Sequence, residues 1–280
     1  MRASDRWTTL VTARLAEMDE LCPGRAATGP GFWNRRARRF AAATDGTATR
    51  KDPLYARLRR ASGRRTTLLD VGSGPGRFSL ALAPHVAQVV AVDHSAGMVR
   101  ILTERSKELG LDNVRTVTGA WQDVGVVPAD VGICSYVLPL VKDVAPFLQK
   151  LDASCRRRVF VYLNAASLDS LVDPMWRHFH GRPRAPGPTY LDAVAVLAEL
   201  GITADVEVVE IPTRSRHDDL DAAVKAYADQ LCLPKGAGPR KELRRVLSSW
   251  LVEDGGRLRP PLRTTPAAII SWAPEPAPAP

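Results

Sequence analysis

The chain has 280 residues, of which 45% are hydrophobic and 25% charged, a composition typical of a globular protein with a substantial core. No apolar run reaches the roughly 20 residues that span a bilayer. The N-terminal apolar pattern is interrupted by acidic residues, which is not typical of a signal peptide. These features predict a cytoplasmic protein with no membrane partner.

The net charge is +9, from 39 Lys and Arg against 30 Asp and Glu. Such a balance accompanies either a solvated, arginine-rich surface or binding of nucleic acid or an anionic substrate. The basic residues are spread along the chain, with one tight cluster at Arg35, Arg36, Arg38 and Arg39. No aromatic-basic RNA-binding signature is present, so the solvated surface is favoured and nucleic acid is left open as a partner.

The cysteines give no signal of a metal site or of a disulfide framework. None of them forms a C-x-x-C pair or lies at zinc-ligand spacing from a histidine. We therefore expect no metal and four reduced thiols, at Cys22, Cys134, Cys155 and Cys232.

The first 60 residues are expected to form a helical lid. Apolar residues from Trp7 to Met18 recur at helical spacing and predict an amphipathic helix. A Pro/Gly-rich break follows at 22–31, and Phe32 to Phe40 predict a second helix.

From residue 66 the pattern alternates between short apolar strands and helices. Strands are predicted at 66–71, 88–93, 114–118, 131–135 and 158–163, and helices after Gly76, from the Ser95 cap to Gly110, and around 140–155. Because each crossover between parallel strands needs a helix, this order predicts a doubly wound, mostly parallel α/β sheet.

The second half continues the same domain, which we expect to span 61–273. A helix at 189–200, a sixth strand at 204–212 and a seventh at 267–273 are predicted. Two amphipathic helices, 220–231 and 243–251, lie between the last two strands in a helical insertion at 214–259. The proline-rich tail 274–280 is predicted to be disordered.

A glycine-rich loop ends the first strand and opens a helix, in the sequence Asp70-Val-Gly72-Ser-Gly74-Pro-Gly76. Glycines let a ligand approach the backbone, and the free N–H groups of a helix N-terminus lie at the carboxyl edge where open α/β sheets bind ligands. Asp93 closes the second strand, where a carboxylate can accept both hydroxyls of an adenosine ribose. The alternatives are a purely structural turn and a helix-capping acid.

The loop departs from the dinucleotide fingerprint, since Arg77 stands where the third glycine is required. The carboxylate of Asp70 would repel a pyrophosphate but suits a cationic ligand. No G-K-S/T follows, so the phosphate-binding Walker pattern is absent.

The segment DVGSGPGRF resembles the glycine loop of class I S-adenosylmethionine-dependent methyltransferases, and AVDHSAGMV resembles their second motif. The resemblance covers roughly 68–161. It implies S-adenosylmethionine as cofactor and a seven-stranded sheet of order 3-2-1-4-5-7-6, with the seventh strand antiparallel.

The resemblance also implies the cofactor-binding residues. Gly72, Ser73, Gly74 and Gly76 would line the methionine and ribose moieties, Asp70 would hold the loop or the amino group, Asp93 the ribose, His94 and Met98 the adenine, and Ser135 and Tyr136 would lie beneath the methyl sulfonium. Two positions depart from the family. Ala120 and Trp121 replace a common Asp-Ala pair at the adenine, leaving Trp121 as an adenine contact or a core residue, and 152–158 replaces a Pro-Gly-Gly turn.

The sequence favours in-line methyl transfer to a small-molecule acceptor, for which the enzyme mainly aligns the nucleophile. Arg214, Arg216, Lys225 and Lys235 in the insertion favour an anionic acceptor, if the insertion shapes the acceptor pocket; it could instead extend the core or contact a second copy. Candidate catalytic residues are Tyr136, His178 and His180, with a solvated or structural role favoured for both histidines. The alternatives are an RNA or protein methyltransferase and a non-catalytic S-adenosylmethionine-binding protein.

Overall fold

A computed structural model describes residues 1–22, 29–42, 46–165, 169–213, 215–234 and 236–275. Its centre is a seven-stranded sheet of order β3-β2-β1-β4-β5-β9-β6. The strands are β1 (Thr67–Val71), β2 (Gln88–Asp93), β3 (Val114–Thr118), β4 (Ala129–Ser135), β5 (Cys155–Asn164), β6 (Asp205–Pro212) and β9 (Thr264–Trp272). Only β9 runs antiparallel to its neighbours. Because β9 is the seventh strand that the sequence predicts, the expected strand order is confirmed.

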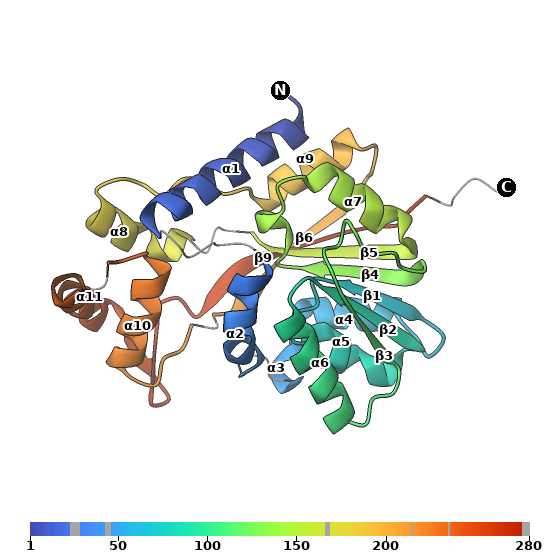
Figure 1. The fold of residues 1–280 in the computed structure, drawn as a ribbon, viewed down its shortest axis with the longest axis horizontal. Helices are drawn as coiled ribbons and strands as arrows, with labels where there is room; N and C mark the ends of the chain where they lie inside the picture. The colour runs from blue at the N-terminus through green and yellow to red at the C-terminus, as the bar shows by residue number, and fades with distance from the viewer. Residues whose placement is uncertain (23–28, 43–45, 166–168, 214, 235, 276–280) are drawn as a thin grey trace.

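Helices cover both faces of the sheet (Figure 1). One face packs against α1 (Ala3–Leu21), α7 (Val144–Ala153) and α9 (Tyr190–Glu199). The other packs against α4 (Pro53–Ala61), α5 (Arg77–Leu82) and α6 (Ala96–Glu108). Neighbouring strand residues such as Leu68 and Leu69 enter opposite cores because side chains alternate along a strand. The buried strands therefore read as continuous apolar runs, as expected for a parallel sheet.

The N-terminal region divides into two parts with different positions. Helix α1 lies along α7 and α9, where Trp7 is fully buried and its indole N–H donates to the Val141 carbonyl at 2.8 Å. Helix α2 (Pro30–Ala42) instead packs on α6, through Ala37 and Met98. A short α3 (Gly46–Arg50) connects it to α4. The two helices expected within 1–60 are present, and α3 and α4 are additional; of the predicted break at 22–31, residues 23–28 lie outside the described residues.

The insertion forms a separate core with a helix that the sequence reading missed. Helices α10 (Leu220–Gln230) and α11 (Ala237–Trp250) match the two expected helices, and a small hairpin of β7 (Val252–Asp254) and β8 (Arg257–Arg259) follows them. They share a buried cluster with α8 (Asp169–His180), a helix that carries both candidate histidines and that the sequence analysis did not predict. Figure 1 shows these three helices gathered beyond one end of the sheet. Residues 214, 235 and 276–280 lie outside the described part, so Arg214, Lys235 and most of the predicted tail are not placed.

The expectation of four reduced thiols is wrong for two of them. Cys22, at the end of α1, and Cys232, after α10, form a disulfide with a Cα–Cα distance of 5.4 Å. They are 210 residues apart in sequence. No short-range sequence pattern could therefore predict the pair, which forms only because the fold brings the two cysteines together. Cys134 and Cys155 are free and buried. Among the described residues, no helix is long and apolar enough to cross a membrane.

Candidate active site

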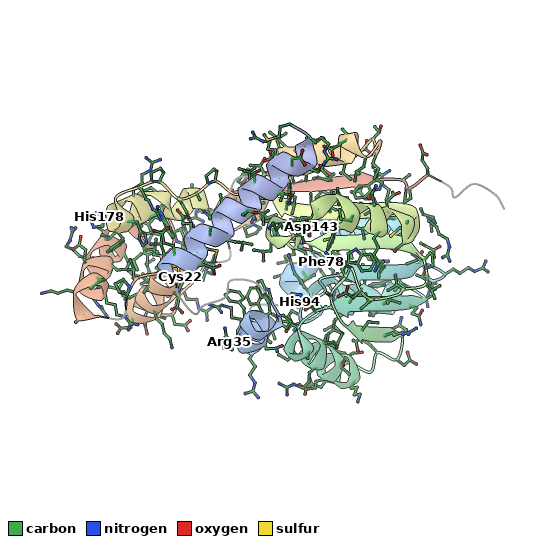
Figure 2. The ribbon with its side chains drawn as sticks, turned by 45° about the horizontal axis from the view of Figure 1, so that its top comes forward. Cys22, Arg35, Phe78, His94, Asp143 and His178 are labelled. Atoms are coloured by element: carbon green, nitrogen blue, oxygen red, sulfur yellow. A yellow bond between two sulfur atoms is a disulfide. The ribbon has the colours of Figure 1, made fainter. Side chains whose placement is uncertain are left out.

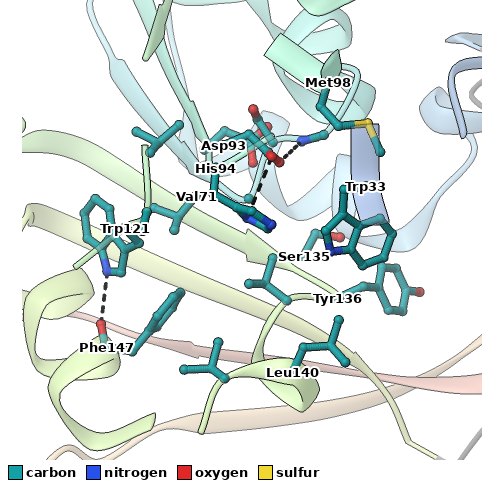
Figure 3. A pocket seen from close by; sticks show the side chains of 18 of the residues that line it. Trp33, Val71, Asp93, His94, Met98, Trp121, Ser135, Tyr136, Leu140 and Phe147 are labelled. Atoms are coloured by element: carbon teal, nitrogen blue, oxygen red, sulfur yellow. Dashed lines mark hydrogen bonds and ion pairs between the residues drawn. The ribbon is translucent and has the colours of Figure 1, made fainter. Parts of the chain in front are cut away.

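A cavity of about 600 Å³ lies at the carboxyl ends of β1, β2 and β4. It is lined by every residue predicted to bind the cofactor except Gly76. Figure 3 shows it extending from Trp121 and Phe147 at one end to Trp33 and Tyr136 at the other, with Asp93 and His94 between them. The sequence motifs therefore converge on one site, at the sheet edge where ligands bind to open α/β folds.

The glycine loop is pinned to the neighbouring strand and open to the cavity. The backbone N–H groups of Gly72 and Ser73 both donate to the Val92 carbonyl, at 2.8 and 3.0 Å. Gly74 has φ +55°, and a Cβ built there would meet no atom within 4 Å, so a side chain would project into free space. At Gly72, by contrast, a Cβ would lie 2.2 Å from Val137 Cγ2.

Gly76 is tightly packed and is not among the residues that line the cavity. It is the N-cap of α5 with φ 88°, in the left-handed region. A Cβ at this position would lie 2.9 Å from both Leu102 and Leu80. The third glycine thus allows α5 to approach α6.

Asp93 presents its carboxylate to the cavity in a fixed orientation. Its Oδ2 accepts from the Gly74 N–H and its Oδ1 from the Ser95 N–H, both at 2.8 Å. Helix α6 is capped by Ser95, whose Oγ accepts from the Met98 N–H, so Asp93 is not the helix cap. Burial raises the pKa of Asp93, although these hydrogen bonds oppose the rise. Each oxygen keeps a lone pair for a ligand hydroxyl.

Asp70 adds a second carboxylate at the base of the cavity. Its side chain is 2% exposed, and its Oδ2 accepts from the Ser79 hydroxyl at 2.6 Å. Burial raises the pKa of Asp70 to about 6, the Ser79 hydrogen bond opposes this, and the nearby Asp93 charge adds to it. Two buried carboxylates repel a phosphate and favour a cation. The carboxylates of Asp70 and Asp93 therefore fit a ligand that carries a ribose and a positive charge, as S-adenosylmethionine does.

At the expected adenine end, Trp121 is both a lining residue of the cavity and a buried core residue. Trp121 lines the cavity, yet it is 5% exposed and donates through its indole N–H to the Phe147 carbonyl at 3.2 Å. Trp121 lies in the loop between β3 and β4. The Lys150 ammonium group fixes this loop by donating to the carbonyls of Trp121 and Val124. His94 Nε2 is buried and has no hydrogen-bond partner among the described residues. This end therefore offers stacking surface and one polar atom.

The opposite end is formed by the end of β4 and by helix α2. Tyr136 has φ 59°, uncommon for a residue other than glycine, and its N–H donates to the Tyr162 carbonyl at 2.8 Å. The two rings are 5.0 Å apart, and burial raises the pKa of Tyr136 to about 12. Trp33 and Phe40 of α2 close this end. The sequence analysis missed both, although residues seven apart share one helix face.

Arg77 is a second residue that the sequence analysis did not assign to the site. It lines the cavity and pairs through Nη2 with Asp52, the N-cap of α4. Its Nη1 is buried without a partner among the described residues. A guanidinium with one free donor can hold a carboxylate or another anionic group of a ligand.

Neither candidate histidine lies in the cavity. His178 is on α8, where its Nε2 contacts Glu242 Oε1 at 2.9 Å, and His180 Nε2 contacts the Leu231 carbonyl at 2.7 Å. Figure 2 shows His178 at the far end of the helical cluster from His94. No described residue of the insertion lines the cavity either. The structure thus brings the cofactor motifs together, but the candidate histidines and the helical insertion, which were expected near the acceptor, lie outside the cavity.

Known proteins resemble this chain over the same region. Residues 68–158 match the family model described as a methyltransferase domain. An uncharacterized protein of Haemophilus influenzae is 31% identical over 170 residues, which are 59% of this chain and 62% of that protein. The ribosomal RNA small subunit methyltransferase G of Neisseria gonorrhoeae is 43% identical over 68 residues, 23% of this chain and 32% of that protein.

A third relative has a solved structure. The uncharacterized methyltransferase YcgJ of Bacillus subtilis is 25% identical over 117 residues, covering 40% of this chain and 46% of that protein. Its crystal structure superposes with a TM-score of 0.53 over 79% of this chain and 98% of that chain, at 15% identity. This similarity establishes the fold. The chain spans less than two thirds of the length of each of these curated relatives.

Residues 68–158 are a methyltransferase domain of the class I, Rossmann-like, S-adenosylmethionine-dependent type. The resemblance of the glycine loop to that of a methyltransferase domain is thereby confirmed over these residues.

Proposed function

We propose that the protein transfers the methyl group of S-adenosylmethionine to a small-molecule acceptor. The observation that carries this proposal is the cavity, which is about 600 Å³ in volume and is lined at one end by Trp33 and Phe40 of α2. A space of this size accommodates the cofactor and one compact acceptor group.

The cavity residues support one orientation of the cofactor. The adenine would lie near His94 and Trp121, and the ribose hydroxyls would bond to Asp93. Met98, expected at the adenine, instead lies beside Trp33 at the other end of the cavity (Figure 3). The cationic methionine end would lie near Asp70, which directs the sulfonium toward Ser135 and Tyr136. The cofactor supplies an electrophilic methyl group, so the chain has to align an acceptor nucleophile with it.

The acceptor end is largely apolar. Besides Tyr136, it contains Val137, Leu140 and Val141, with Lys142 and Asp143 also lining the cavity. Because its pKa is raised to about 12, Tyr136 remains protonated at neutral pH and acts as a hydrogen-bond donor that orients the acceptor. This favours an acceptor whose nucleophile requires no strong base, such as an amine, a thiol or an acidic hydroxyl.

The test is methyl transfer with radiolabelled S-adenosylmethionine to a panel of small amines, thiols, phenols and carboxylates. Wild-type protein is expected to label members of one chemical class. The matched control is Asp93→Ala, which should lower labelling at subsaturating cofactor by roughly tenfold or more. If the folded protein binds the cofactor but labels no small molecule while it labels RNA or protein, the small-molecule proposal is wrong.

A second candidate, RNA methylation, is favoured by one observation. The helix that lines the acceptor end with Trp33 and Phe40 is rich in arginine, so cations able to bind RNA lie on the same helix as two cavity residues. The helical insertion, which was expected to govern acceptor choice, contributes no described residue to the cavity; it extends the core with α8.

We include the cytoplasmic location expected from the sequence in this proposal. The Cys22–Cys232 disulfide is a type of cross-link that persists mainly in oxidising compartments. Cell fractionation combined with thiol labelling would decide, since recovery of the disulfide-bonded protein outside the cytoplasm contradicts the proposal.

A further inference from the structure

The net charge of the chain is concentrated in one segment, residues 34–65. This basic segment contains 11 of the 39 Lys and Arg residues and only 2 of the 30 Asp and Glu residues. The rest of the chain therefore holds 28 of each and is neutral. Ten of the eleven cations are arginines. The sequence-based interpretation of a dispersed, solvated charge does not describe this distribution.

Most cations of the basic segment have no acidic partner among the described residues. Arg35, Arg38, Arg50, Lys51, Arg60, Arg64 and Arg65 are exposed, and no ion pair involving them occurs among the described residues. Arg57 is an exception, because it pairs with Glu207. Arginines elsewhere are commonly neutralised, as in the pairs Arg6–Asp192 and Arg158–Asp205. A cluster of cations without acidic partners makes the electrostatic potential of the surface positive. The mutual repulsion of these cations destabilises the folded chain.

Three cations of the basic segment lie near His85. The pKa of His85 is lowered, first by burial and then by the charges of Arg59, Arg50 and Arg64. These three arginines come from α4, from the end of α3 and from the chain after α4, so the elements converge near His85. Helix α3 also packs against α5 and α4.

Helix α2 carries further cations of the basic segment, on a different side from its cavity-lining residues. On α2, Trp33 and Phe40 line the cavity, and at 100° per residue Arg35 and Arg38 lie on the opposite side of the helix. Figure 2 shows Arg35 pointing away from the molecule beneath α2. Aromatic and basic groups alternate here, since the Arg36 guanidinium lies 3.8 Å from the centre of the Phe32 ring.

We propose that the basic segment docks a single-stranded RNA on the surface outside the cofactor cavity. Cations distributed over three helices exceed what a small anion can contact, whereas a phosphate backbone engages many at once. Arginine next to aromatic rings is typical of surfaces on which bases stack. An anionic membrane fits less well, because the apolar side of α2 is already packed on α6 through Ala37 and Met98.

The docking surface is independent of the proposed function, because it rests on charge outside the cavity. Binding can therefore be measured on the full chain without cofactor, as fluorescence anisotropy of a labelled oligouridine of about 20 nucleotides. The affinity is expected to fall steeply between about 50 and 200 mM salt, with a slope that reports several phosphate contacts.

The decisive variant is Arg60→Gln/Arg64→Gln/Arg65→Gln, because all three side chains are exposed. It should weaken RNA binding by at least roughly tenfold and reduce the salt slope by about 2. The matched control removes three exposed cations elsewhere, in Arg115→Gln/Arg240→Gln/Lys241→Gln, and should change the affinity less than about twofold. Circular dichroism verifies that both variants fold.

Three outcomes would overturn the proposal. The first is equal loss of RNA binding in the two triple variants, which indicates a nonspecific effect of net charge. The second is absence of salt-dependent RNA binding by the wild-type chain. The third is binding of polyglutamate, or of vesicles containing phosphatidylserine, as tight as that of RNA, which would assign the surface to an acidic protein or to a membrane.

Discussion

The carboxylate of Asp93 accepts a hydrogen bond from the backbone N–H of Gly74 at 2.8 Å. This contact joins the end of β2 to the middle of the glycine loop, 19 residues earlier in the chain. It means that the two principal cofactor motifs are mechanically coupled. Loss of the carboxylate should therefore affect both the ribose contact and the position of the loop.

Asp93→Ala is expected to weaken cofactor binding by about 1–3 kcal/mol, because a charge-assisted hydrogen bond is lost. Isothermal titration calorimetry with S-adenosylmethionine or its demethylated product measures the change. Asp123→Ala removes an exposed acid near Trp121 and serves as the control. Unchanged affinity in a folded Asp93→Ala protein would contradict the ribose assignment.

Gly74→Val should abolish cofactor binding, because the new side chain projects into space in which no protein atom lies within 4 Å of the Cβ. The φ of +55° at Gly74 also makes the substitution strained, by roughly 1–2 kcal/mol. Gly201→Val is the matched control, since Gly201 has φ +79°, equally open space and no place in the cavity. Both variants should lose similar stability in urea, whereas only Gly74→Val should lose binding. Normal binding by Gly74→Val would place the cofactor elsewhere.

Asp70 predicts opposite effects of pH on stability and on binding. Its folded pKa of about 6 lies above the usual value of 3.8, so the folded state binds the proton more tightly. The resulting stabilisation is complete below about pH 4 and is lost as the pH rises through 6. Asp70→Asn should therefore raise the free energy of unfolding at pH 7, by up to about 3 kcal/mol, and leave it nearly unchanged at pH 4.

Cofactor binding should show the reverse dependence on pH. A cationic ligand needs the ionised carboxylate, so wild-type affinity is expected to fall as the pH drops below about 6, and Asp70→Asn should bind weakly at every pH. Calorimetry between pH 5 and pH 8, with urea unfolding in the same buffers, measures both quantities. A variant that is neither stabilised nor impaired in binding at pH 7 would refute the assignment.

The Cys22–Cys232 disulfide should contribute to global stability. It closes a loop with a sequence separation of 210 residues, for which the chain-entropy model gives a stabilisation of at most about 5 kcal/mol. Cys22→Ser/Cys232→Ser is expected to lower the thermal midpoint by several degrees. Dithiothreitol should destabilise the wild-type chain and have no effect on the double variant. An equal response of both proteins to the reductant would indicate that the thiols are not paired.

The local rules were sufficient for the sheet and the cofactor motifs. Strand, glycine loop and acidic strand end follow from residues 66–93, and the order of alternating elements fixes the parallel core. The sequence signals were insufficient wherever distant segments meet. The disulfide and the cavity contacts of Trp33 and Phe40 depend on how helices outside the sheet pack. The hydrophobic periodicity of a single segment contains no information about this packing.

Helix α8 was missed for a different reason. Its segment contains Pro174 and ends near Gly181, both typical of loops. Burial of Met175 and Trp176 against α10 and α11 outweighs that local preference. The same packing draws His178 and His180 away from the cavity, so their candidacy could be judged only after the fold was known.

Tyr136 offers the sharpest test of the acceptor end. Tyr136→Phe keeps the ring that packs 5.0 Å from Tyr162 and removes only the hydroxyl, so cofactor affinity should be unchanged while turnover of the acceptor falls roughly tenfold, as expected when one orienting hydrogen bond is lost. Because the pKa of the hydroxyl is raised to about 12, the wild-type rate should show no inflection from this group between about pH 7 and 9. Tyr136→Gly is the companion variant; it relieves the φ of 59° but removes the ring, and it should lose both turnover and stability. An unchanged rate in Tyr136→Phe, or a rate inflection near neutral pH that this substitution abolishes, would show that the hydroxyl does not act as a protonated donor.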